Sequence, residues 1–383
     1  VAFVALNVAV VRRTSAGQSA IESFHNDVYS RIGDVIGNVT VVQSYTRLAA
    51  ERAAMRELMG RLLRAQYPVL TWWGVLTVLT RAAGTISMVT VFALGASIGA
   101  WVGADVAGQL ADAYGWRQVF LWLGIPGVIF GVLIFFTIRE PKRGQLDLNK
   151  SEDSPSFAAT FKYLLQQRSA IHVMLGSALT ALWGWGLVWW TPTFLIRNFG
   201  LTAGEAGVLT GPMHLWGGSL ATLFTAWLVA RPSMIDPRRV VWLMGAVIGI
   251  STVVSWFIYT SDSLQTIELL FWIFIPSIYF YIGPCFGLLN NLAEPRMRAM
   301  FCAFTLFVAN VGNLIIAPQL VGLLSDHYIS TGMDNAQSLR TAMLWLVPTG
   351  LWATFHYFWA ARQIVADQTR ATGINPLAEA RAP

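Results

Sequence analysis

The sequence predicts an all-α polytopic membrane protein, and two observations carry that fold class. Of its 383 residues, 55% are hydrophobic and 12% are charged, about half the charged fraction of a soluble domain. Several apolar stretches approach the roughly 20 residues that a helix needs to cross a hydrocarbon core of about 30 Å. Backbone groups in lipid must be hydrogen-bonded internally, so each such stretch is expected to be a spanning helix.

The first elements expected from the amino-terminal end are a short apolar piece and a polar helical region. Residues 1–11 are apolar but too short to span, and they carry no cleavage signature, so they are interpreted as the end of a helix that is cut. Residues 12–66 hold eight arginines interleaved with acidic residues. That pattern is typical of helical segments outside the bilayer.

A long apolar block follows, and after it come the remaining predicted spans. Residues 67–110 contain only two charges, Arg81 and Asp105, and the block is roughly twice as long as one crossing requires. A polar turn at 114–117 precedes a span at 119–138, and 139–168 forms a polar connector. Six further spans are predicted at 169–191, 203–229, 239–260, 266–289, 299–323 and 341–361.

The basic residues are distributed unequally between the two sides of the predicted spans. The loops at 139–168, 231–239 and 291–298, together with the tail, hold fourteen Lys or Arg, whereas the alternate loops hold three. The positive-inside rule therefore predicts a cytoplasmic carboxyl terminus in an inner (plasma) membrane. This topology explains the net charge of +6, so no nucleic-acid partner is expected. Cys285 and Cys302 have no metal-ligand spacing, and neither a metal nor a cofactor is expected.

The chain after residue 94 contains a series of motifs in a fixed order. Small residues recur at a spacing of four, which puts them on one helix face: Gly95, Gly99, Gly103 and Ala107-Gly108. They are followed by Gly115-Trp116-Arg117 and by the run Arg-Glu-Pro-Lys-Arg-Gly at 139–144. Further motifs are Trp-Thr-Pro-Thr-Phe-Leu-Ile-Arg at 190–197, Leu-Thr-Ala-Gly-Glu-Ala-Gly at 201–207, Glu-Pro-Arg-Met-Arg-Ala at 294–299 and Ala-Pro-Gln-Leu-Val-Gly-Leu-Leu-Ser-Asp at 317–326.

Over about 94–370 these motifs resemble the major facilitator superfamily from its fifth helix onward, and within it the Spinster-like transporters. The resemblance implies a truncated facilitator helical bundle, without the first four helices of the family and with an extra helical segment in front. One departure is the stretch Trp-Leu-Val-Ala-Arg at 227–231, which lacks the Gly-Gly and the acidic residue usual there.

The first 95 residues resemble a different family. The segment 37–51, beginning Gly-Asn-Val-Thr-Val-Val-Gln-Ser-Tyr-Thr-Arg, and the segment 81–88 are similar to the membrane domain of ABC exporters, most of all exporters of cyclic glucans. The resemblance implies a span end, a cytoplasmic coupling loop and a second span. A P-loop needs a lysine after glycine, and none of the three lysines follows one. ATP hydrolysis is therefore not expected, and the chain is predicted not to be an enzyme.

The two resemblances meet near Gly95 without a loop between them. Three regions are predicted: an ABC-exporter-like fragment at 1–93, two facilitator helices with the connector at 94–168, and the six-helix facilitator half with its tail at 169–383. Both adjoining spans would start in the cytoplasm, so the join is either one overlong helix or two spans hinged near Gly95 and Gly99. The single helix is favoured, because the hinge would place the eight arginines outside.

Polar and aromatic groups within spans are the candidate cavity residues, because such groups are costly in lipid. Asp105 lies in mid-span, off the small-residue face. It is interpreted either as a group that carries a proton in the transport cavity or as a structural carboxylate bonded to a neighbouring helix. The amides of Asn290, Asn310 and Asn313 are interpreted as substrate ligands or as interhelical hydrogen-bonding groups. The aromatic candidates are Trp183, Trp185, Tyr279 and Tyr281, with His172 and His214 as titratable alternatives.

The resemblance and these residues together predict a secondary transporter. It would move a small amphipathic or lipid-like solute across the bilayer by alternating access, driven by an ion gradient. Two alternatives stay open: a fusion or truncated remnant that transports nothing, and a membrane subunit of an ABC exporter whose ATPase is on another chain. A partner chain supplying the missing helices is a further possibility.

Overall fold

The computed structural model describes residues 14, 21–22, 25–30, 48–137, 155–373 and 375–379, and side chains at 48–52 and 73–94 are outside the description. Within these residues every regular element is a helix, which confirms the predicted all-α fold class. The chain divides into two compact units, Val1–Val91 and Phe92–Pro383. The predicted segments 1–11 and 37–47, and most of the connector 139–168, lie outside the described residues.

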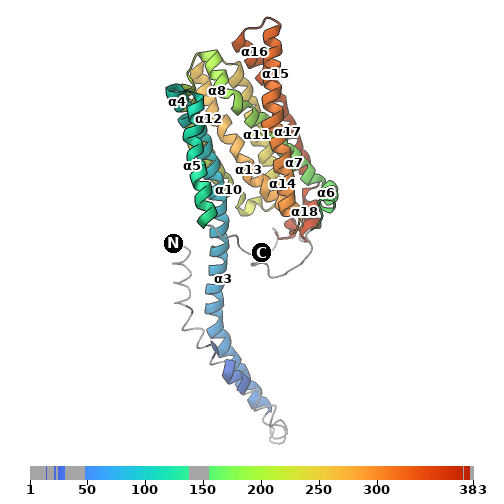
Figure 1. The fold of residues 1–383 in the computed structure, drawn as a ribbon. Helices are drawn as coiled ribbons and strands as arrows, with labels where there is room; N and C mark the ends of the chain where they lie inside the picture. Colours follow the sequence, from blue (N-terminus) through green and yellow to red (C-terminus); the bar gives the residue numbers. More distant parts are fainter. Residues whose placement is uncertain are drawn as a thin grey trace. The chain divides into compact units, whose positions relative to one another are not determined.

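The described part of the first unit consists mainly of the helix α3 (Leu48–Trp101), which continues into the second unit (Figure 1). Its charged face carries an ion pair at helical spacing between Arg61 and Glu57. Its backbone stays helical through Gly95 and Gly99, as the single-helix prediction requires.

The second unit begins with three consecutive helical segments. The π-helical turn η1 (Val102–Val106) continues α3 and leads into α4 (Ala107–Tyr114). Gly115 then reverses the chain with φ of 81°, a left-handed conformation that suits glycine. Beyond it, α5 (Trp116–Thr137) runs for 22 residues.

The rest of the second unit is a helical bundle in which single spans are built from several helical segments (Figure 1). Its segments are α6 (Phe157–Gln166), α7 (Arg168–Thr180), η2 (Ala181–Trp185), α8 (Gly186–Phe199), α9 (Ala203–Pro212), η3 (Met213–Gly218), α10 (Ser219–Val229), η4 (Pro232–Met234), α11 (Pro237–Thr260), α12 (Leu264–Phe280), α13 (Ile282–Leu292), α14 (Arg298–Asn310), η5 (Val311–Ile316), α15 (Ala317–Ser330), α16 (Asn335–Leu344), α17 (Val347–Ala360), α18 (Ile364–Thr372) and α19 (Pro376–Glu379). The segments η1, η2, η3 and η5 are π-helical, so each inserts a wide turn into its span.

Five helices of the described residues are long and apolar enough to cross a membrane. Four of them cover the predicted spans at 169–191, 239–260, 266–289 and 299–323, and the fifth is Trp116–Thr137. The predicted spans at 203–229 and 341–361 are also largely helical, through α9–η3–α10 and α17, but they are not among these five.

The core of the bundle lies where α7, α11, α12 and α17 meet. Its largest fully buried side chains are aromatic, and they include Trp183, Tyr259, Tyr279 and Tyr357. Their polar atoms are hydrogen-bonded: Tyr259 pairs with Thr191 at 2.8 Å, and Tyr357 with Thr180 at 3.2 Å. Buried aromatic groups with satisfied polar atoms hold the spans in one arrangement.

Candidate functional site

The main candidate site is a cavity of about 390 Å³ within the second unit, which we call the aromatic cavity. It lies between the end of α3 with η1, the segments η2 and α8, and the segments α9 and η3, with α12 behind. Its lining residues are Ala96, Gly99, Ala100, Gly103, Ala104, Trp185, Val188, Trp189, Thr191, Pro192, Thr210, His214 and Ile275. Small-molecule sites in proteins have volumes of this order.

One wall of the aromatic cavity is a cluster of rings around Trp185. This ring stacks on His214 at 6.4 Å between centroids and an interplanar angle of 17°. It meets Tyr279 edge-on at 5.3 Å and approaches Trp189 at 6.2 Å. Behind the wall, Nδ1 of His214 and the hydroxyl of Tyr279 are hydrogen-bonded at 2.8 Å. Three spans therefore contribute to one hydrogen-bonded aromatic surface.

The π-helical turns position the two central rings of this cluster. Trp185 is the last residue of η2. His214 is the second residue of η3, which begins directly after Pro212. A π-turn holds one residue more than an α-turn, and such turns occur frequently at functional sites. The apolar character of these segments predicts spans, but the wide turns cannot be recognised from composition.

The opposite wall consists of small residues at the end of α3 and in η1. A Cβ atom placed on Gly99 or Gly103 would meet no atom within 4 Å. The predicted small-residue face was expected to allow another backbone to approach closely at Gly95, Gly99, Gly103 and Gly108. Within the second unit only Gly108 does so: its Cβ would lie 2.5 Å from the carbonyl oxygen of Ala203. Gly99 and Gly103 instead leave the space that forms the cavity.

The glycines that allow close helix packing lie on α9, and the sequence analysis missed them. A Cβ at Gly207 would overlap the carbonyl oxygen of Ala104, and one at Gly211 would lie 2.7 Å from Cβ of Asp105. A Cβ at Gly204 would lie 2.6 Å from a carboxylate oxygen of Asp112. The signal that identifies this face is the spacing of three and four residues between these glycines.

Asp105 lies in this helix contact and is not among the residues that line the aromatic cavity. Its half-buried carboxylate accepts hydrogen bonds from Nε1 of Trp101, at 2.9 Å, and from Nε2 of Gln109. Both donors are on its own helical stretch. The helix face of Asp105 is therefore the face that packs against α9, whereas Gly103 faces the cavity.

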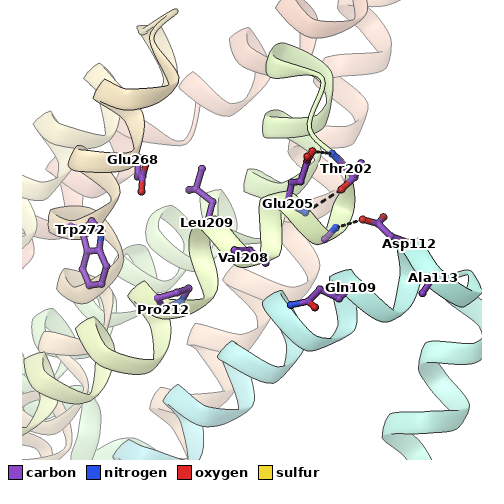
Figure 2. A pocket seen from close by; sticks show the side chains of 11 residues that line it. Gln109, Asp112, Ala113, Thr202, Glu205, Val208, Leu209, Pro212, Glu268 and Trp272 are labelled. Atoms are coloured by element: carbon purple, nitrogen blue, oxygen red, sulfur yellow. Dashed lines mark hydrogen bonds between the residues drawn. The ribbon is translucent and has the colours of Figure 1, made fainter.

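Asp112, in the last turn of α4, is bonded to the start of α9 (Figure 2). Its Oδ2 accepts a hydrogen bond from the backbone N–H of Gly204 at 2.7 Å. A carboxylate at a helix amino terminus satisfies a free N–H and interacts favourably with the helix dipole. The side chain of Thr202 and the N–H of Gly204 hold the pKa of Asp112 below its ordinary value of 3.8.

A second, more open hollow of about 820 Å³ lies beside this contact (Figure 2). Its acidic lining residues are Asp112, Glu205 and Glu268. Two of the three already have partners: Asp112 bonds to Gly204, and Glu205 accepts from the N–H of Thr202 at 2.9 Å in a capping box. These carboxylates cap α9, and the described residues contain no group of three or more metal-ligating side chains.

The aromatic residues predicted from the sequence separate into cavity and core. Trp185 lines the aromatic cavity, and Tyr279 supports it through His214. Trp183 is fully buried, donates from Nε1 to Oγ of Ser255 at 3.0 Å and meets Phe274 edge-on, so it packs in the core. Tyr281 is buried at the turn between α12 and α13, and its hydroxyl is near Ser177 and Trp185.

The three predicted amides lie elsewhere. Asn290, near the end of α13, accepts a hydrogen bond from Sγ of Cys302 at 3.5 Å. Asn310 and Asn313 share a helix face, as their spacing predicts, and are bonded to each other at 3.4 Å. The buried Asn313 also donates to the carbonyl of Ala309 at 3.1 Å. None of the three lines the aromatic cavity.

His172 pairs with a histidine that the sequence analysis did not select. Its Nδ1 is 2.8 Å from Nδ1 of His356, so one proton shared between the nitrogens joins α7 to α17. The sequence analysis placed His172 near the end of a span, which the start of α7 at Arg168 agrees with. The pair is distant in sequence, and only the fold brings it together.

Comparison with known proteins gives two family matches in the order that the sequence predicts. Residues 74–317 match the Major Facilitator Superfamily, and residues 1–101 match the ABC transporter transmembrane region. Among curated proteins, the beta-(1-->2)glucan export ATP-binding/permease protein NdvA of Rhodopseudomonas palustris is 44% identical over 95 residues, which are 25% of this chain and 16% of that protein. NdvA of Brucella abortus is 45% identical over 96 residues, with the same two shares. The chain thus spans about one-sixth of the length of these relatives.

Two solved structures resemble the fold. Both are of a bacterial homolog of the human lysosomal transporter Spinster in an inward-facing conformation. The unoccupied form aligns with a TM-score of 0.60 and 22% identity over 75% of this chain and 72% of that chain. The occupied form aligns with a TM-score of 0.52 and 19% identity over 78% and 71%. These similarities confirm the predicted resemblances, and because the facilitator match covers more than half of the sequence, the chain belongs to the major facilitator superfamily.

Proposed function

We propose that the chain is a secondary transporter in which the aromatic cavity binds a small amphipathic solute. The observation that carries the proposal is the meeting of Trp185, His214 and Tyr279 from three spans at one cavity. Facilitator transporters bind solute between helices that move against each other. Apolar walls with a few placed polar groups are the usual composition of such a site.

The energy source in this proposal is an ion gradient. The sequence has no P-loop pattern, since none of its three lysines follows a glycine. Two titratable groups are candidates to carry a coupling proton: His214, which lines the cavity, and Asp105, which lies beside it. Asp105 has two hydrogen-bond donors that favour a structural role, whereas His214 faces the cavity.

The proposal includes the placement of the chain. The fourteen-to-three excess of basic residues supports a plasma membrane with a cytoplasmic carboxyl terminus. The regions 1–93, 94–168 and 169–383 are proposed as an exporter-like segment, two facilitator helices with a connector, and the second facilitator half. A carboxyl-terminal reporter that is active only in the periplasm would contradict this topology.

One observation favours a second function. Residues 1–101 match the ABC transmembrane region, and relatives of that part export a glucan with an ATP-binding domain. The chain would then be a membrane subunit that uses an ATPase from a partner chain. A non-transporting remnant is the third alternative, and it is favoured because none of the apolar window of α5 is buried within the described residues.

Uptake by proteoliposomes that contain only this chain separates the three. The labelled solutes are alkyl glycosides, alkanoates and alkyltrimethylammonium ions. We expect at least one of them to enter vesicles with the parent chain faster than vesicles with the Gly103→Leu variant, in which leucine fills the cavity. A protonophore should abolish this uptake, and vanadate should not change it. Uptake stimulated by an added ATPase and inhibited by vanadate would support the ABC subunit, and rates equal to Gly103→Leu for all solutes would support the remnant.

The control for this experiment is Gly131→Leu on α5. Both glycines have no atom within 4 Å of an added Cβ, but only Gly103 lines the cavity. Loss of uptake in both variants would point to a general effect of leucine on the helices.

A further inference from the structure

Among the described residues, no charged side chain lines the aromatic cavity. Its lining consists of apolar and aromatic residues, together with three polar side chains: Thr191, Thr210 and His214. The ion pairs of the second unit lie at other positions and join Arg238 to Asp236, Arg340 to Asp262 and Arg370 to Asp367. A charged ligand group would therefore enter the cavity without a described counter-ion.

The carboxylates of the neighbouring segments are either hydrogen-bonded or outside the cavity. Asp105 of η1 accepts hydrogen bonds from Trp101 and Gln109, and Glu205 of α9 closes the capping box with Thr202. Glu268 of α12 lines the other hollow and is absent from the aromatic cavity. No carboxylate in the described part of η1, α9 or α12 lines this cavity.

The hydroxyl groups of the cavity already have partners. Thr191 donates to the carbonyl of Leu187 at 2.9 Å and accepts from the hydroxyl of Tyr259 at 2.8 Å. Thr210 donates to the carbonyl of Ala206 at 2.9 Å. Neither hydroxyl needs a ligand to satisfy its hydrogen bonds. His214 is therefore the polar side chain of the cavity that remains available to a ligand.

His214 has one ring nitrogen engaged and one available. Nδ1 is bonded to the hydroxyl of Tyr279, while Nε2 has no hydrogen bond among the described residues. The side chain is 4% exposed and lines the cavity, so the cavity is the space from which a partner reaches this nitrogen. A ligand that supplies one hydrogen bond here pairs a nearly buried polar group that has no partner in the described protein.

We propose that the aromatic cavity selects uncharged amphiphiles with one hydrogen-bonding head group placed at Nε2 of His214. The inference rests on the proposed function and specifies its class of solute. The apolar chain lies along Trp185, Trp189 and the small residues of α3 and η1. Transfer of an unpaired charge to such a site costs far more than transfer of a hydroxyl that finds a hydrogen bond.

Three probes of equal chain length test this selection: 1-decanol, decanoate and decyltrimethylammonium. Each is equilibrated by dialysis at pH 8 with the full chain in phosphatidylcholine nanodiscs. Binding to the cavity is the amount of probe bound by the parent nanodiscs minus the amount bound by nanodiscs with the Gly103→Leu variant. In this variant leucine fills the cavity, while the probe partitions into the lipid to the same extent. We expect decanol to bind at least tenfold more tightly than either ion.

Variants of His214 test the position of the head group. His214→Phe should weaken the cavity-specific binding of decanol roughly three- to tenfold, which is the loss of one hydrogen bond. His214→Gln, which keeps a hydrogen-bonding nitrogen at this position, should retain most of the binding, and it provides a readout if His214→Phe does not fold. Equal affinity for decanol in all three proteins would overturn the role of His214.

The outcomes separate this inference from the proposed function. If decanoate or decyltrimethylammonium binds the cavity as tightly as decanol, selection against charge is wrong while the cavity remains a binding site. If none of the three probes exceeds the Gly103→Leu control, the cavity does not bind amphiphiles, and the proposed function loses its site as well.

Discussion

Two apolar spans of the second unit, α5 and the span Arg168–Phe199, differ in how the protein surrounds them. The helix α5 has a mean hydropathy of 2.5 and none of its apolar window is buried. Arg168–Phe199 has a lower mean hydropathy, 1.4, and 61% of its window is buried. Strong hydropathy therefore identifies a span but not its protein neighbours, whereas small and polar residues within a span indicate packing.

The glycines of the two spans show the same difference. In the packed span, a Cβ at Gly186 would lie 2.6 Å from Cβ of Ala317, and one at Gly184 would lie 2.6 Å from Ile278. In α5, Gly124, Gly127 and Gly131 have no atom within 4 Å of an added Cβ.

Truncation of one tryptophan in each span should give the largest contrast. Trp183→Ala removes a fully buried ring and its hydrogen bond to Ser255, and we expect a loss of about 3–5 kcal/mol in the free energy of unfolding. Trp122→Ala on α5 removes a ring that is 61% exposed, with an expected change of about 0.5 kcal/mol or less. Reversible unfolding in mixed micelles measures both values. Similar losses in the two variants would mean that α5 is packed as tightly as Arg168–Phe199.

Added volume should produce a smaller contrast at the glycines. Gly186→Val would overlap Ala317 and Leu346, and overpacking of this kind costs about 1–3 kcal/mol. Gly131→Val on α5 meets no described atom, and its stability should equal that of the parent chain. The midpoint of thermal unfolding, followed for the two variants side by side, checks this. A destabilised Gly131→Val would reveal a neighbour of α5.

The smallest expected effect on stability is that of Asp112, in the last turn of α4 before α5 begins. Because the hydrogen bonds from Thr202 and Gly204 lower its pKa, its contribution to stability is present above the ordinary value of 3.8 and is lost as the pH falls through the lower, folded value. Asp112→Asn should therefore lower the unfolding midpoint at pH 7, and the difference from the parent should shrink progressively as the pH is lowered below about 4. A difference that is constant over this range would exclude the carboxylate as its source.

Much of the fold could be predicted from the sequence because its signals are local. Apolar length identifies the spans, and the spacing of Asn310 and Asn313 places them on one face. The aromatic cavity could not be predicted as a unit, because Gly103, Trp185, His214 and Tyr279 are far apart in sequence. Trp183 and Trp185 are two residues apart, yet one is in the core and the other in the cavity.

The glycine face of α9 shows a different limit of the sequence. Gly204 and Gly207 are visible in the sequence as part of the motif at 201–207, but the role of this face depends on which helix lies opposite. The structure places Ala104, Asp105 and Gly108 there. The ladder at Gly95, Gly99 and Gly103 also recurs at helical spacing, four residues each time, and yet contacts nothing described at its Cβ positions. Spacing alone thus identifies a face and not its partner.

Alternating access of the aromatic cavity is the central claim, and cysteine labelling tests it directly. In a chain with Cys285→Ala and Cys302→Ala, the variant Ala100→Cys places a thiol on the cavity wall, and Ala353→Cys places one in the core as a control. Right-side-out and inside-out vesicles are treated with a membrane-impermeant maleimide. The account predicts that Ala100→Cys is labelled from both sides and Ala353→Cys from neither. Labelling of Ala100→Cys from one side only, or from neither, would contradict it.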